Sequence, residues 1–150
     1  MMDLSDLYQE LILDHSRSPR NFGRLATFNM TQQGFNPVCG DQVTFYILES
    51  EGVIQDISFE GEGCAIAMAS ASLLTDVLKG KSVEQMHHLF DDFTQVVTTG
   101  EVDEAIEARL QKLIVLAGVS QYPVRVKCAT LAWHTVKAAV SDEDIVATTE

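Results

Sequence analysis

Three cysteines and one aspartate are the residues of this chain whose types and positions could do chemistry together. Cys39 precedes Asp41 by two residues in the segment "NPVCGD", and Cys64 and Cys128 follow much later in the chain. Three thiolates and one carboxylate make a complete tetrahedral ligand set for a borderline-soft ion such as zinc. A thiolate is also the form of cysteine that attacks sulfur or carbon. These four residues are therefore candidates for a metal site or for nucleophilic chemistry.

Each cysteine is predicted to lie at the boundary of a secondary-structure element. Cys39 falls in the turn that leads into a hairpin, Cys64 at the start of a buried helix, and Cys128 at the start of the last helix. The partial positive charge at a helix N-terminus favours the thiolate form. In an extended segment, side chains two residues apart point to the same side, so Cys39 and Asp41 can face one centre. Gly40 between them permits a close approach of the backbone.

The spacing of the cysteines leaves three interpretations open: structural cysteines, a metal site, or a cysteine nucleophile with a histidine base. Cysteine is often a buried apolar residue, and the separations match no short zinc-finger pattern. A histidine base is disfavoured, because His134 falls on a different helix face from Cys128 and the adjacent His87 and His88 cannot both point at one site. All four histidines, including His15, are expected at the surface or partly packed.

Composition and charge narrow the class of protein. The chain has 150 residues, 46% of them hydrophobic and 21% charged, which is typical of a single globular domain. The net charge of -12 would repel nucleic acid and anionic membranes. No apolar run reaches the length of a membrane span, and the N-terminus is acidic where a secretory signal would be basic. We therefore expect a cytoplasmic protein whose three cysteines are reduced thiols or metal ligands.

Hydrophobic periodicity predicts one α+β domain over residues 1–150, with a polar tail at about 141–150. The predicted elements are a helix from residue 4 to about 16, a loop over 24–36 with one short strand, a hairpin of strands 43–50 and 53–60, and helices over 61–80, 82–93, 102–119 and 128–140. The apolar stripe of segment 102–119 makes it the clearest helix. Trp133 and Tyr122 are interpreted as packing residues.

Three motifs together resemble the IscU-like family of iron–sulfur cluster assembly proteins, and specifically its SufU-type branch. They are "NPVCGD", "GEGCAIAMASASLL" and "YPVRVKCATLAWHTVKAA", and they occur in the family's order over nearly the whole chain. The resemblance implies a SufE/IscU-like α+β fold, with a small antiparallel sheet of about three strands and helices packed on one face. It also implies that the three cysteines and the aspartate gather at one exposed end.

Three departures from the scaffold branch favour the SufU-type branch. Lys127 stands where scaffold members carry a histidine immediately before the last cysteine. The segment "QYPVR" replaces the Leu-Pro-Pro-Val-Lys motif that a chaperone reads. About twenty extra residues relative to that branch lie roughly within 88–108, before the last cysteine.

The resemblance further implies a zinc-dependent sulfurtransferase that accepts persulfide sulfur from a SufS-type, pyridoxal-phosphate cysteine desulfurase and passes it to iron–sulfur assembly components. Zinc would be held by Cys39, Asp41, Cys64 and Cys128. Cys39 would be the acceptor, released from the metal when the desulfurase docks, and Arg125 would offset negative charge or contact the partner. Two alternatives remain open: a scaffold that assembles a transient [2Fe–2S] cluster on the same ligands, and a purely structural zinc domain.

Overall fold

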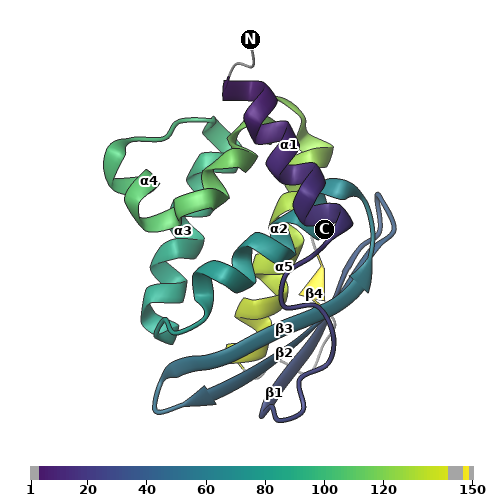
Figure 1. Ribbon diagram of the computed structural model, residues 1–150, viewed down its shortest axis with the longest axis vertical. Coiled ribbons are helices and arrows are strands. Elements are labelled where there is room, and N and C mark those ends of the chain that lie inside the picture. The colour runs from purple at the N-terminus through teal and green to yellow at the C-terminus, as the bar shows by residue number, and fades with distance from the viewer. Residues whose placement is uncertain (1–3, 142–146, 149–150) are drawn as a thin grey trace.

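A four-stranded sheet with helices on one of its faces forms the framework of the computed structural model, which describes residues 4–141 and 147–148 (Figure 1). The strand order is β3-β2-β1-β4. The strands are β1 (Met30–Asn36), β2 (Asp41–Ser50), β3 (Val53–Glu62) and β4 (Ala147–Thr148). The helices are α1 (Leu4–Arg17), α2 (Ala65–Leu78), α3 (Val83–Thr99), α4 (Glu104–Leu110), the 3-10 helix η1 (Gln111–Gln121) and α5 (Pro123–Val140).

The strands β1, β2 and β3 form an antiparallel meander, which confirms the predicted fold class. The turn between β2 and β3 uses Glu51 and Gly52, both with positive φ (52° and 80°), which suits the twist of a tight hairpin. β1 occupies the end of the segment predicted as a loop with one strand. Its register with β2 places Asn36 directly opposite Asp41. The first connection of the sheet therefore carries the "NPVCGD" motif.

The helices α2 and α5 cover the inner face of the sheet, as Figure 1 shows. Eleven residues of α2 are buried, as its small and apolar composition predicts. α5 approaches β1 very closely, because a Cβ atom at Gly34 would collide with the Thr135 hydroxyl. Trp133, as predicted, packs in the core, where it stacks on Phe93 and meets Phe90 edge-on.

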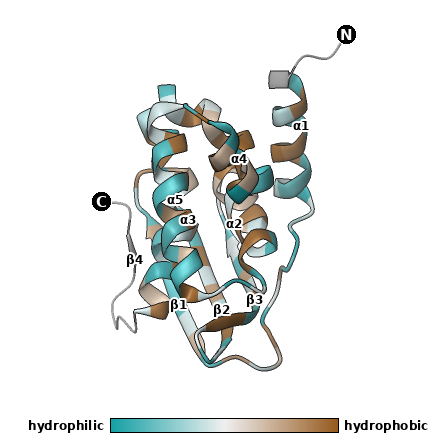
Figure 2. Ribbon diagram, turned by 90° about the vertical axis from the view of Figure 1, so that its left-hand side faces the viewer, coloured by the Kyte–Doolittle hydropathy of each residue, from teal (hydrophilic) through white to brown (hydrophobic). Residues whose placement is uncertain are grey.

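The helices α1 and α3 form an outer layer, and in Figure 2 α1 carries both hydrophilic and hydrophobic turns. α3 begins with the predicted cap at Ser82, which forms a capping box with Gln85, and it continues to Thr99 before Gly100 ends it. The expectation that every histidine lies at or near the surface was wrong for His15, which is 1% exposed. Its Nδ1 atom lies 2.7 Å from Ser72 Oγ, so a hydrogen bond joins α1 to α2.

The single helix predicted over 102–119 is wrong, because the chain breaks at Gln111. This residue has φ 56° and ψ −127°, so α4 ends at Leu110 and a 3-10 helix follows. The apolar stripe that predicted one helix nevertheless packs on the core, with Ile106 in α4 and Leu113 in η1 both buried. Hydrophobic spacing therefore located the buried residues but did not reveal the break in the backbone.

The last helix begins at Pro123 rather than at Cys128, which corrects a second boundary. Proline at the first position of a helix loses no hydrogen bond, so the helix starts there without cost. Of the predicted polar tail, residues 142–146 and 149–150 lie outside the described residues. Ala147 and Thr148 form β4, which pairs in parallel with Gly34 and Phe35 of β1. No helix in the described part of the chain is long and apolar enough to cross a membrane.

Candidate metal centre

The turn between β1 and β2 presents Cys39 at the exposed end of the sheet. The N–H of Gly40 donates to the carbonyl of Asn36 (2.8 Å), and Gly40 has φ 72°, a left-handed conformation that closes the turn. Cys39 is exposed, whereas Asp41, the first residue of β2, is 0% exposed. The two residues do face one centre, but a turn brings them together rather than the extended segment that the sequence predicted.

Asp41 is held by hydrogen bonds to both of its carboxylate oxygens. The Cys64 backbone N–H donates to Oδ1 (2.8 Å), and the Asn36 side-chain amide donates to Oδ2 (3.0 Å). The described residues show no lysine or arginine paired with this buried carboxylate. A buried charge is costly unless an opposite charge balances it, so a cation at this position is favourable.

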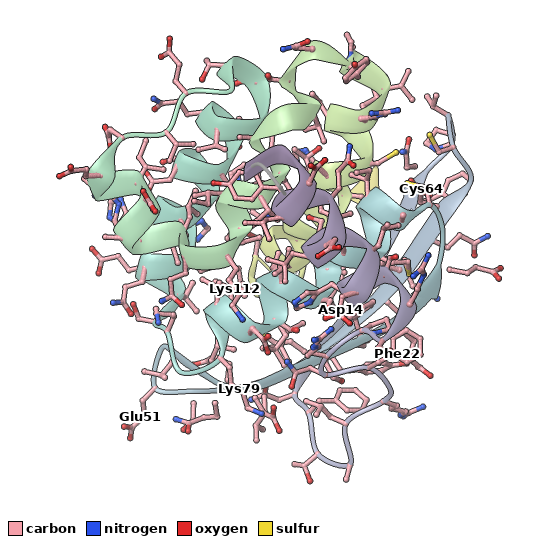
Figure 3. The ribbon with its side chains drawn as sticks, turned by 45° about the horizontal axis from the view of Figure 1, so that its top comes forward. Asp14, Phe22, Glu51, Cys64, Lys79 and Lys112 are labelled. Atoms are coloured by element: carbon pink, nitrogen blue, oxygen red, sulfur yellow. The ribbon has the colours of Figure 1, made fainter. Side chains whose placement is uncertain are left out.

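Cys64 lies at the N-cap of α2, as predicted. Its Sγ accepts a hydrogen bond from the Ala67 backbone N–H (3.4 Å) and lies 3.9 Å from Asp41 Oδ2. Cys64 is half-buried and adjoins the other candidate ligands. In Figure 3 it lies on the side of the molecule away from α4.

Cys128 is buried in the second turn of α5, so the expectation of a thiol at a helix N-terminus was wrong for this residue. Burial, followed by hydrogen bonds with Cys39 and Cys64, raises the pKa of the Cys128 thiol. Its Sγ lies 3.3 Å from Cys39 Sγ and 3.5 Å from Asn36 Nδ2. Deprotonation of such a thiol is favoured by a bound metal ion rather than by its surroundings in the protein.

The ligand atoms of Cys39, Asp41 and Cys128 all lie within 4.8 Å of one another. Two sulfurs that each lie about 2.3 Å from one zinc ion can be at most about 4.6 Å apart, and the Cys39 and Cys128 sulfurs meet that condition at 3.3 Å. Cys64 is outside this three-atom group but contacts Asp41. The donor set fits a borderline-soft ion, with three sulfur ligands and one oxygen ligand available.

Arg125 lies three residues before Cys128 and is exposed near the same end of the molecule. Its guanidinium stacks over the Tyr122 ring, 4.4 Å from the ring centroid. Tyr122 is 49% exposed, so its interpretation as a packing residue was wrong. Lys127 is half-buried, and no carboxylate in the described part of the chain pairs with Arg125 or Lys127.

Asn36 is the residue of this centre that the sequence reading missed. It is 0% exposed and contacts both Asp41 and Cys128. Asparagine before proline is a common turn signal, which hides any other role. The sequence feature that could have indicated a role for Asn36 was its position directly before a turn that holds a candidate metal ligand. The extra segment near 88–108, in contrast, lies in α3 and α4, on the opposite side from Cys64 in Figure 3.

The fold and the cluster define a small α+β domain that presents one exposed thiol over buried thiol and carboxylate groups. Residues 7–145 match the NifU-like N-terminal domain family, and the chain belongs to that family. The resemblance to iron–sulfur assembly proteins is thereby confirmed.

Two curated relatives match over nearly the full chain. The zinc-dependent sulfurtransferase SufU of Bacillus subtilis (strain 168) is 37% identical over 142 residues, which cover 95% of both chains. The iron–sulfur cluster assembly scaffold protein IscU of Streptococcus pyogenes serotype M1 is 39% identical over 137 residues, covering 91% of this chain and 84% of that protein.

A solved structure shares the fold at similar identity. It is a protein proposed as an iron–sulfur cluster assembly scaffold of the SUF system in Fervidobacterium islandicum AW-1. It aligns with a TM-score of 0.81 at 32% identity, covering 92% of this chain and 99% of that chain.

Proposed function

We propose that this protein is a zinc-dependent sulfurtransferase that accepts sulfane sulfur at Cys39 from a SufS-type, pyridoxal-phosphate cysteine desulfurase for iron–sulfur cluster assembly. The observation that carries the proposal is the difference in exposure among the three cysteines. Cys39 is exposed, Cys64 is half-buried and Cys128 is buried, although the Cys39 and Cys128 sulfurs lie 3.3 Å apart. Only Cys39 combines membership of the cluster with access for a large donor protein.

The metal would be held by Cys39, Asp41, Cys64 and Cys128. When bound, zinc keeps cysteine ligands in the thiolate form at neutral pH and supplies no redox chemistry. The protein's own part is to bury Asp41 and Cys128 as an anchor while the short turn leaves Cys39 accessible. Arg125 would offset negative charge at this end or contact the donor protein.

The transfer step is a thiol exchange without net oxidation. The Cys39 thiolate attacks the terminal sulfur of the donor's cysteine persulfide, and a new bond forms between Cys39 Sγ and that sulfur. The sulfur–sulfur bond of the donor breaks, and the donor cysteine leaves as a thiolate. The terminal sulfur keeps its proton, so Cys39 becomes a persulfide and the donor is ready for another turnover.

The surface around Cys39 supports contact with a protein partner. Val38, Tyr122 and Val124 are 53%, 49% and 50% exposed, and they belong to the two segments that carry Cys39 and Cys128. Aromatic and apolar side chains with a neighbouring arginine are typical of interface residues. The reaction would take place in the cytoplasm, where the thiols stay reduced.

The decisive experiment is cysteine-dependent sulfide production by a SufS-type desulfurase from the same source, with and without this protein. We expect stimulation that disappears when zinc is removed, returns when zinc is added back, and is absent in Cys39→Ser. Zinc-loaded protein that leaves turnover unchanged would contradict the proposal. A structural zinc domain would give a different pair of results. The wild type would not stimulate the desulfurase, and Cys39→Ser would lose its zinc and unfold.

A second candidate function is assembly of a [2Fe–2S] cluster as cargo on the same ligands, because several relatives of similar identity are named scaffold proteins. Lys127 stands directly before Cys128, where the resemblance expects a histidine in scaffold members. An ammonium group carries no lone pair for iron, so this position cannot supply a ligand while it is protonated. Anaerobic reconstitution that gave a stable cluster, accepted by an apo-protein, would favour the scaffold function.

A further inference from the structure

We propose that Asn36 is a positioning residue of the metal centre, whose side-chain amide holds Asp41 and Cys128 in place for the ion. The inference rests on the proposed metal site and adds a residue that binds no metal itself. Asn36 is completely buried, makes two short contacts and has a fixed place in the hairpin register.

The hairpin register places the amide precisely enough for this role. Asn36 is the last residue of β1 and pairs directly with Asp41, the first residue of β2. Directly opposed residues of an antiparallel pair project on the same side of the sheet. The Gly40 N–H to Asn36 carbonyl bond closes the turn beside the pair. The backbone therefore sets the position of Asn36 relative to Asp41, and the side chain has little freedom to turn away.

The chemistry of the two contacts identifies which end of the amide faces the centre. Asp41 Oδ2 lies 3.0 Å and Cys128 Sγ 3.5 Å from Asn36 Nδ2. A carboxylate oxygen and a thiolate sulfur are both acceptors, so the NH2 group, and not the amide oxygen, suits both. An NH2 group has two hydrogens, one for each acceptor. A neutral double donor lowers the repulsion between two anionic ligands without adding a competing ligand of its own.

The hydrogen bond from Asn36 completes the support of the Asp41 carboxylate. The Cys64 N–H binds Oδ1 at 2.8 Å while Asn36 binds Oδ2, so the plane of the carboxylate is fixed from both ends. Each oxygen retains a lone pair for the metal. Without the amide, Oδ2 would lose this neutral donor in a position where Asp41 is 0% exposed. The carboxylate would then be less well oriented before the ion arrives.

The test measures metal affinity and spectrum, without a desulfurase. Zinc affinity is determined by competition with a chromophoric chelator, and the absorption spectrum is recorded with Co²⁺ in place of zinc. For Asn36→Ala we expect affinity about 10- to 100-fold weaker, the range found when partners of metal ligands are removed, and a changed Co²⁺ spectrum. Asn36→Asp keeps the shape but replaces the donor with an anion, so we expect at least as large a loss.

Asn29→Ala is the matched control. Asn29 donates from its amide to the Glu49 carbonyl (2.7 Å) and accepts from the Glu49 N–H (2.8 Å), next to the start of β1 and the end of β2. Asn29→Ala therefore removes an asparagine that is bound to the same hairpin but lies away from the metal centre. This variant should keep the zinc affinity and the Co²⁺ spectrum of the wild type. Unfolding of the metal-free variants is measured alongside, because a purely structural Asn36 would lower stability in the absence of metal without changing the Co²⁺ spectrum.

The outcomes separate this inference from the proposed function. Wild-type protein that binds neither zinc nor Co²⁺ would overturn the metal centre and the role of Asn36 together. Wild-type affinity and spectrum in Asn36→Asp, or in a folded Asn36→Ala, would overturn the role of Asn36 alone. Failure of the desulfurase assay would leave the result of this experiment unchanged, since no sulfur transfer is measured.

Discussion

Gly63 and Asp41 are in such close contact that a Cβ atom at position 63 would lie 2.6 Å from Asp41 Oδ1. Asp41 is a short side chain with no exposed surface, so it cannot move aside without losing the Cys64 N–H bond. Glycine at this position therefore makes room for the carboxylate.

Gly63→Ala should weaken zinc binding while leaving the fold intact. The added methyl group displaces the Asp41 carboxylate, and we expect a loss of affinity of about 10-fold or more, comparable to removal of a group that supports a ligand. The measurement is competition with a chromophoric chelator. Gly118→Ala is the control, because a Cβ atom at that position would meet no atom within 4 Å. Equal affinities for the two variants would contradict the expectation that Gly63 makes room for a metal-binding Asp41 carboxylate.

Arg125→Ala should separate sulfur transfer from metal binding. Arg125 is exposed and contacts Tyr122, and it is not among the candidate ligands, so we expect an unchanged zinc content and a stimulation of the desulfurase at least about 10-fold lower, as for removal of an interface arginine. Arg24→Ala is the matched control, since Arg24 is also exposed and lies over two aromatic rings, those of Phe28 and Tyr46. A parallel decrease in both variants would attribute the effect to net charge alone.

Removal of zinc should make Cys39 and Cys128 vulnerable to oxidation as a pair. Their sulfurs lie 3.3 Å apart and Cys39 is exposed, so hydrogen peroxide should convert the two thiols to a disulfide and two molecules of water. Peptide mass spectrometry should find a Cys39–Cys128 crosslink in metal-free protein and little in zinc-loaded protein. The crosslink should persist in Cys64→Ser. Predominant pairing of Cys39 with Cys64 would contradict this expectation.

The hairpin strands could be predicted because their signals are local, whereas the gathering of Cys39, Asp41 and Cys128 was implied by the resemblance of three distant motifs. Alternating residues and the Glu51–Gly52 turn indicated the β2–β3 hairpin, and the cysteine motifs indicated the centre. The burial of Cys128 could not be predicted in this way, because it depends on a helix that begins five residues earlier, at Pro123. Asn36 was missed for a related reason: its contact with Cys128 exists only once α5 has packed against β1.

The buried His15 should make stability fall on mild acidification. Burial lowers the pKa of His15 below its ordinary value, with Arg20 adding to the effect and Asp76 and Asp14 opposing it. The backbone N–H of Arg20 donates to Ser72 Oγ (2.8 Å). The Ser72 hydroxyl hydrogen is therefore available to donate to Nδ1 of a neutral His15. The unfolded chain therefore binds a proton near pH 6.5 that the folded protein binds only at lower pH.

The contribution of neutral His15 to the free energy of unfolding is fully present above about pH 6.5. It is lost as the pH falls toward the pKa of His15 in the folded protein. Urea unfolding at pH 7.5 and 5.5 should show a smaller loss for His15→Asn, which retains an acceptor for Ser72 but cannot be protonated in this range. His134, whose pKa is also lowered by burial, is present in both proteins and cancels in the comparison. An equal loss in both would assign the pH dependence to other groups.

The break at Gln111 should be a point of stored strain. Its φ of 56° and ψ of −127° lie in a region that glycine adopts readily and residues with a Cβ atom avoid. Gln111→Gly should therefore raise the free energy of unfolding by about 1 kcal/mol, because relief of about 1–3 kcal/mol of strain exceeds the entropic cost of glycine. Lys112→Gly, at the next exposed position, should destabilise the protein. Equal destabilisation by both substitutions would show that the backbone at Gln111 stores no strain that glycine can relieve.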